Sequence, residues 1–189
     1  MKTSYLSLFL FCFIFFSNKA YSNQDIKKNI LEHLISLKIF SASFLQSDGQ
    51  NISEGRFYIG ENRLRAEYVS PSKILIVLDK NKAMYYNYEL DEDEFFNPKD
   101  TSAWFLYDIF KNPFFFEDGI IELKDNELII KKNGLDNQQR EFLIKVYFEN
   151  NPLILRKVEV LLDQDYFQLS IYNHNYNQEF NKKFFKLIN

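Results

Sequence analysis

The sequence predicts a mainly β protein whose strands form one strongly curved antiparallel sheet or an incomplete barrel. About eleven segments of strand length alternate apolar and polar side chains, and turn residues such as Gly, Asn, Asp and Pro separate them. Helical spacing appears in only two places, at 25–37 and 101–110. No repeat, linker or low-complexity segment divides the chain. The helices must therefore pack on a face of the sheet or across its open end.

The first 22 residues have the features of a secretory signal peptide. Lys2 precedes the apolar run Leu6–Phe16, which is too short to span a bilayer, and small side chains stand near the predicted cleavage site after Ser22. The alternative is an uncleaved N-terminal anchor. We expect residues 1–22 to be removed during export and residues 23–189 to form a single domain.

Composition excludes some classes of function. The formal charge of −3 becomes −5 once Lys2 and Lys19 leave with the leader, and the chain has no basic run. A mildly acidic chain of this kind is a poor binder of nucleic acid. The single cysteine, Cys12, lies in the leader, so we expect neither disulfides nor thiol chemistry in the mature domain. The 21 Phe and 12 Tyr residues fit a binding cavity, but also a genome rich in their codons.

The first half of the predicted domain begins with an amphipathic helix over Asp25–Leu37, which places His33 on the solvent side. A strand over Ile39–Ser47 follows, with aromatic side chains on one face. Residues 54–79 then form three consecutive strands, the second of which ends at Pro71 because proline cannot donate to the ladder. Alternation places these side chains on the inward face of the second and third strands of the sheet: Phe57, Ile59, Leu64, Ala66 and Tyr68. The same alternation points the side chains of Arg56, Arg65 and Glu67 outward.

The pattern changes in the middle of the chain. After a strand over Ala83–Tyr88, an acidic loop leads to a short strand near Phe95, and a strongly apolar helix covers Thr101–Phe110. This helix is either a lid over the sheet or an ordinary core helix. The strand pattern then resumes, with turns that include Asn133-Gly134, over these segments: Ile120–Lys124, Glu127–Lys131, Glu141–Phe148, Leu153–Leu162 and Tyr166–Asn173.

A search for catalytic or metal-binding patterns gives little. The two histidines, His33 and His174, stand far apart without ligand-like spacing, and the acidic run Asp91–Glu94 lacks the glycine and distal glutamate of an EF-hand. No phosphate-binding Gly-rich loop or nucleophile elbow is present. We expect no metal, no cofactor and no enzymatic activity. An enzyme with carboxylates brought together on a curved sheet is the alternative from another class.

Several blocks resemble the outer-membrane lipoprotein carrier proteins of the LolA type. The resemblance is dense over about 40–107 and topological afterwards, and the leader, length and order of elements agree. The blocks that carry it are Phe40-x-Ala42-Ser43-Phe44-x-Gln46, Gly55–Ile59, Arg65-x-Glu67-Tyr68-x-x-Pro71, Ile74–Asp79 with Tyr86-Asn87, and Thr101–Leu106 at the position of the lid helix.

This resemblance implies an unclosed antiparallel β-barrel with an N-terminal helix and a helical lid. It implies a monomeric periplasmic chaperone that accepts acylated lipoproteins from an inner-membrane ABC-type lipoprotein-releasing complex and passes them to an outer-membrane receptor. The expected acyl-chain contacts combine the inward strand face with aromatic and lid positions: Phe40, Phe44, Phe57, Ile59, Leu64, Ala66, Tyr68, Trp104, Leu106 and Ile109. A module of the same fold that transfers or senses another lipid is the alternative.

The sequence departs from the family pattern at one functional point. The family's arginine that holds the lid closed follows the second strand in a Lys-Arg-Pro-Gly-like turn. Here the turn is Gly60-Glu61-Asn62-Arg63, about one residue shorter and without proline. Arg63 is the candidate latch that the resemblance implies, although it is out of register.

Overall fold

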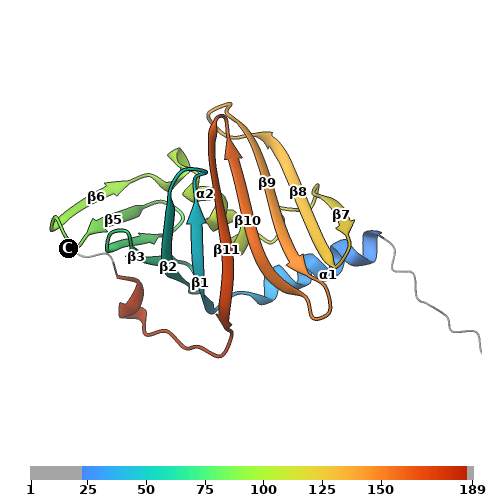
Figure 1. The fold of residues 1–189 in the computed structure, drawn as a ribbon, viewed down its shortest axis with the longest axis horizontal. Helices are drawn as coiled ribbons and strands as arrows, with labels where there is room; N and C mark the ends of the chain where they lie inside the picture. The colour runs from blue at the N-terminus through green and yellow to red at the C-terminus, as the bar shows by residue number, and fades with distance from the viewer. Residues whose placement is uncertain (1–22, 187–189) are drawn as a thin grey trace, which may run out of the picture.

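The computed structural model describes residues 23–186, and these form one eleven-stranded antiparallel sheet with helices packed against it (Figure 1). The strands are β1 (Phe40–Ser47), β2 (Ile52–Ile59), β3 (Leu64–Ser70), β4 (Ile74–Leu78), β5 (Ala83–Asn87), β6 (Glu92–Phe96), β7 (Ile120–Lys124), β8 (Glu127–Leu135), β9 (Glu141–Glu149), β10 (Ile154–Leu162) and β11 (Asp165–Asn175). The predicted leader, residues 1–22, lies outside the described residues.

The sheet is open, as the sequence predicted. Its order is β6-β5-β4-β3-β2-β1-β11-β10-β9-β8-β7, so β6 and β7 are the two edges and do not pair with each other. Figure 1 shows these edges at opposite ends of the curved sheet. The first and last strands of the chain, β1 and β11, pair in its middle. The two halves of the sheet are therefore joined by the strand pair whose members lie farthest apart in the sequence.

Four helical segments accompany the sheet: α1 (Asn23–Ser36), the short η1 (Pro98–Asp100), α2 (Ala103–Lys111) and η2 (Lys182–Phe185). α2 lies in the connection between the two edge strands. Its buried side chains Phe105, Ile109 and Phe110 belong to the same apolar cluster as the inward side chains of β1–β3 and β8–β11. α2 therefore covers the concave face of the sheet. In the described part of the chain, no helix is long and apolar enough to cross a membrane.

Alternation explains why this face is apolar. β9 buries every second side chain from Phe142 to Phe148, and β11 does so from Phe167 to Ile171. β10 follows the same alternation from Val158 onward, after an irregularity near Leu155. At about 25 cal/mol per Å² of buried apolar surface, this continuous cluster is the main source of stability in a chain whose described residues contain no cysteine.

Three local predictions were wrong. Asn133-Gly134, expected as a turn, lies inside β8 and pairs with Leu143 and Phe142, and the turn follows at 136–139. Gly134 fits this strand because a Cβ there would meet the Phe142 ring at 3.2 Å. His33 is half-buried and packs edge-on against Phe148, not on the solvent side.

The acidic run is the third. Most of it forms the exposed edge strand β6 instead of a loop. Charged side chains on an edge strand oppose pairing with another chain.

Candidate functional site: an apolar cavity beneath a tethered helix

A small cavity remains between α2 and the concave face of the sheet. Its volume is about 50 Å³, far below the roughly 300–1,000 Å³ of ordinary ligand pockets. The surface that lines it is almost entirely apolar. The residues that border it are Phe44, Phe57, Ile59, Leu64, Arg65, Ala66, Tyr68, Leu78, Leu106, Phe110, Val158, Leu169 and Ile171. The interior is thus almost filled while α2 stays in place.

Most of the expected acyl-chain contacts border this cavity. Seven of the ten do: Phe44, Phe57, Ile59, Leu64, Ala66, Tyr68 and Leu106. Phe40 lies behind them, fully buried, with its ring edge-on to Phe57 and Phe110. Trp104 stacks on Tyr107 with 5.2 Å between ring centroids, outside the cavity. Ile109 borders a separate groove beside α1.

Six lining residues were missed by the sequence reasoning, which pointed the first of them outward: Arg65, Leu78, Phe110, Val158, Leu169 and Ile171. The alternation of β10 and β11 marks the last three as buried, but it does not show which part of the curved sheet lies beneath the lid. Only the strand order, which places β11 beside β1, brings them to the same cavity.

The phenol of Tyr68 is the one hydroxyl in the lining, and it has a partner. It donates a hydrogen bond of 2.7 Å to Gln46 Oε1 on β1. Burial raises the pKa of Tyr68 to about 12, so the phenol is neutral at physiological pH. The cavity therefore offers an apolar surface, and the guanidinium of its one charged lining residue, Arg65, is already bonded to Glu67 and to the Phe184 carbonyl.

A lysine fastens the C-terminal end of α2 to the sheet. Lys111 Nζ donates hydrogen bonds to the backbone carbonyls of Gly60, in the β2–β3 turn, and of Lys38, which follows α1. The bond to Lys38 O is 3.1 Å. Lys111, the last residue of α2, therefore links this helix to the β2–β3 turn and to the segment that follows α1.

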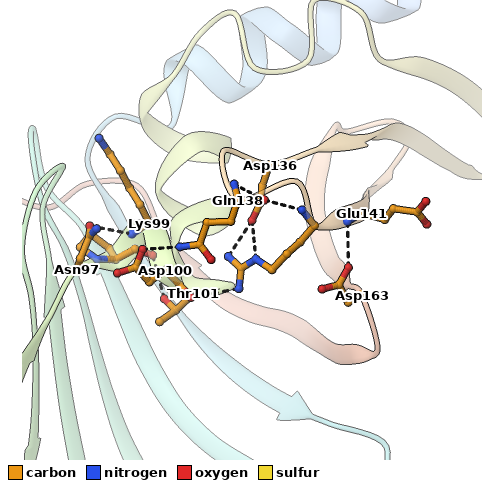
Figure 2. A network of polar contacts seen from close by, with 10 residues as sticks. Asn97, Lys99, Asp100, Thr101, Asp136, Gln138, Glu141 and Asp163 are labelled. Carbon is orange, nitrogen blue, oxygen red and sulfur yellow. Dashed lines mark hydrogen bonds and ion pairs between the residues drawn. The ribbon is translucent and has the colours of Figure 1, made fainter.

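A polar network fastens the other end (Figure 2). Asp100, in η1, accepts a 2.7 Å hydrogen bond from Gln138 Nε2, and its carbonyl accepts one of 3.3 Å from Arg140 Nη1. Asp136 orders this β8–β9 loop by pairing with Arg140 at 2.7 Å. The segment that leads into α2 is therefore attached to the opposite half of the sheet from Gly60.

Arg63, the candidate latch, makes different contacts. Its guanidinium donates a 2.8 Å hydrogen bond to the carbonyl of Phe185 and lies 3.5 Å from Asp79 Oδ2. Arg65 similarly bonds the carbonyl of Phe184 at 2.7 Å. These arginines hold the C-terminal segment, which leaves β11 and runs back past β2 and β3 (Figure 1). The contact between α2 and the β2–β3 turn is made by Lys111.

The described residues contain no group of three or more His, Cys, Asp or Glu side chains placed to hold a metal ion. Their ion pairs include Arg65 with Glu67 at 2.5 Å on β3 and Lys157 with Glu159 at 2.7 Å on β10. The concave interior is thus apolar, and the polar contacts that hold α2 lie at the edge of that interior.

The fold is thus an open, curved antiparallel sheet whose apolar concave face is covered by one tethered helix. Residues 36–188 match the family described as "Outer membrane lipoprotein carrier protein LolA". The chain belongs to this family, whose members are periplasmic carriers and not enzymes.

Other proteins are similar to this chain in sequence or in structure. The chain is 24% identical over 187 residues to the uncharacterized protein RP864 of Rickettsia prowazekii, covering 97% of this chain and 87% of that protein. An uncharacterized conserved protein from Thermus thermophilus superposes with a TM-score of 0.56 at 10% identity, over 86% of this chain and 94% of that one. MucB gives a TM-score of 0.49 at 9% identity, over 89% of this chain and 64% of MucB.

Proposed function

We propose that the protein is a monomeric periplasmic chaperone that holds the acyl chains of lipoproteins between its concave sheet and α2, and delivers them to the outer membrane. An inner-membrane ABC-type complex would load it and an outer-membrane receptor would accept the cargo. The observation that carries the proposal is the apolar interior beneath a helix that polar contacts hold at its two ends.

In the empty protein, the apolar side chains of α2 act as a placeholder: they fill the space that the cargo would occupy. A cavity of about 50 Å³ cannot hold an acyl chain, so α2 must move when cargo enters. Burying a chain of about 16 carbons releases roughly 12 kcal/mol at about 0.8 kcal/mol per methylene. Binding must in turn expose the face of α2 that carries Phe105, Ile109 and Phe110. The net affinity is the difference between these terms, which allows tight shielding and later release.

The test is extraction of a lipoprotein from membranes. The purified protein is incubated with inner-membrane vesicles that contain a triacylated lipoprotein, and the soluble complex is identified by native mass spectrometry. A lipoprotein whose acylated cysteine has been replaced should not be extracted. Outer-membrane vesicles added afterwards should take up the cargo. A soluble complex that forms equally well without acyl chains would refute the proposal.

Two leucine variants locate the cargo. Leu106→Glu places a carboxylate on the cavity face of α2, at a half-buried position, and should abolish extraction. Leu123→Glu makes the same change on β7 at a site that is 58% exposed, and should extract normally. Equal extraction by the two variants would place the cargo outside the cavity.

A further inference from the structure

A second, larger hollow lies outside the lid. It is a groove of about 410 Å³ between α1, the end of α2 and the β2–β3 turn. Its apolar walls come from both helices and from the segments that follow them, and include Leu31, Ile35, Ile39, Pro113 and Phe116. Ile35 and Ile39 remain 42% and 36% exposed. An apolar trough of this size has the capacity of a single small ligand.

One aromatic ring separates this groove from the interior. Phe110 lines both the groove and the 50 Å³ cavity. It is 8% exposed and packs edge-on against Phe40 at 5.6 Å between ring centroids. The groove is therefore a separate site while α2 is in place.

The polar end of the groove carries a cation without a carboxylate partner. Lys111 Nζ bonds only to the carbonyls of Gly60 and Lys38, and no carboxylate of the described residues lies within 4.0 Å of it. Burial lowers the pKa of Lys111 to about 8; Glu61 opposes this shift and the ammonium of Lys38 adds to it. At neutral pH the ammonium is therefore charged and partly desolvated, and its direct partners are carbonyl dipoles, with the Glu61 carboxylate acting on it from beyond 4.0 Å.

We propose that this groove binds a single-chain anionic amphiphile, a long-chain fatty carboxylate, with its chain along the α1–α2 walls and its carboxylate on Lys111 and Lys38. The volume fits one chain, and the two lysines outnumber the single acidic side chain of the lining, Glu61. The carboxylate would supply the ion pair that Lys111 lacks.

Occupancy of the groove acts on the lid. The carboxylate competes with Gly60 O for Lys111 Nζ, and this bond is what fastens the C-terminal end of α2. A bound fatty carboxylate thus favours detachment of that end, and by linkage an open lid binds the carboxylate more tightly. The single tryptophan of the chain, Trp104, lies on α2 and reports the movement by its fluorescence.

The binding test uses three amphiphiles of equal chain length below their micelle concentrations: dodecanoate, dodecyl maltoside and dodecyltrimethylammonium. Calorimetry should give one dodecanoate site at least about tenfold tighter than the other two. Lys111→Met, which keeps the alkyl stem, should weaken dodecanoate binding roughly tenfold. Lys124→Met, at an exposed site on β7, should not. Equal affinities for the three amphiphiles, or equal effects of the two lysine variants, would overturn the proposal.

Further variants separate the groove from the cavity and guard against loss of folding. Ile35→Glu should weaken dodecanoate binding, whereas Leu45→Glu, on β1 and equally exposed at 41%, should not. Lys38→Met tests the same head-group site if Lys111→Met does not fold. Dodecanoate should also change Trp104 fluorescence and speed amide hydrogen exchange within 103–111. Binding blocked by Ala66→Phe in the cavity but not by Ile35→Glu would refute the groove site.

Discussion

Replacing Phe110 with alanine tests whether the lid is held by its packing against the interior. Phe110 is 8% exposed and contacts the rings of Phe40 and Phe57, at 5.6 Å and 6.1 Å between centroids. Phe114, four residues later, is 70% exposed and offers the same substitution without the packing.

The expected cost follows from burial and ring contacts. Burying a Phe side chain contributes roughly 2–3 kcal/mol, and its aromatic pairs add about 0.5–1 kcal/mol. Phe110→Ala should therefore lower the free energy of unfolding by about 3 kcal/mol, near the lower end for buried Phe→Ala substitutions, because Phe110 already borders open space on two sides. Phe114→Ala should cost less than about 0.5 kcal/mol.

Two assays read the outcome. Urea unfolding gives the free energies, and an apolar dye such as N-phenylnaphthylamine reports access to the interior. Removing the Phe110 ring joins the groove to the cavity, so the variant should bind more dye than the wild type or Phe114→Ala. If the two alanine variants have equal stability and equal dye binding, then α2 is not held by its apolar face and the placeholder argument is wrong.

Three other predictions concern the contact between Gly60 and Phe185, the two histidines and Lys111. Gly60→Ala should cost about 1–3 kcal/mol because its Cβ would lie 2.6 Å from the Phe185 ring; in a Phe185→Ala background the added cost should fall below about 1 kcal/mol, and an unchanged cost in this double-mutant cycle would contradict the contact. Burial first, then the charge of His174, lowers the pKa of His33, and burial also lowers that of His174. Both are thus favoured neutral when folded, so stability should fall as pH drops below 6.5, and His33→Gln should reduce that decline in urea titrations at pH 5.5–7. Because the pKa of Lys111 is about 8 in the folded chain against 10.5 ordinarily, the unfolded chain keeps a proton that the folded chain has lost between these values. The contribution of Lys111 to the free energy of unfolding should therefore rise with pH across that window. This rise should be absent in Lys111→Met.

Local pattern predicted much of the fold because strand alternation and turn residues act between near neighbours. The stretch from Phe57 to Tyr68 shows this best, since a strict two-residue period leaves only one face for its apolar side chains. The number of strands predicted one curved sheet or an incomplete barrel, and the resemblance to the LolA-type carriers implied that it is unclosed with a helical lid. Local pattern failed at Gly134, where pairing with β9 and the space needed by Phe142 overrode a turn-like dipeptide.

The sequence by itself therefore determined the strands, the inward face of residues 57–68 and the apolar helix that interrupts the strands. Only the tertiary structure decided how that helix is held. Lys111 bonds a carbonyl 51 residues away, and Arg63 turns instead to a carbonyl 122 residues away. Every residue carries a backbone carbonyl, so an acceptor of this kind leaves no signature in the sequence. Its position is set by the strand register and the curvature of the whole sheet, which place the β2–β3 turn at the end of the lid.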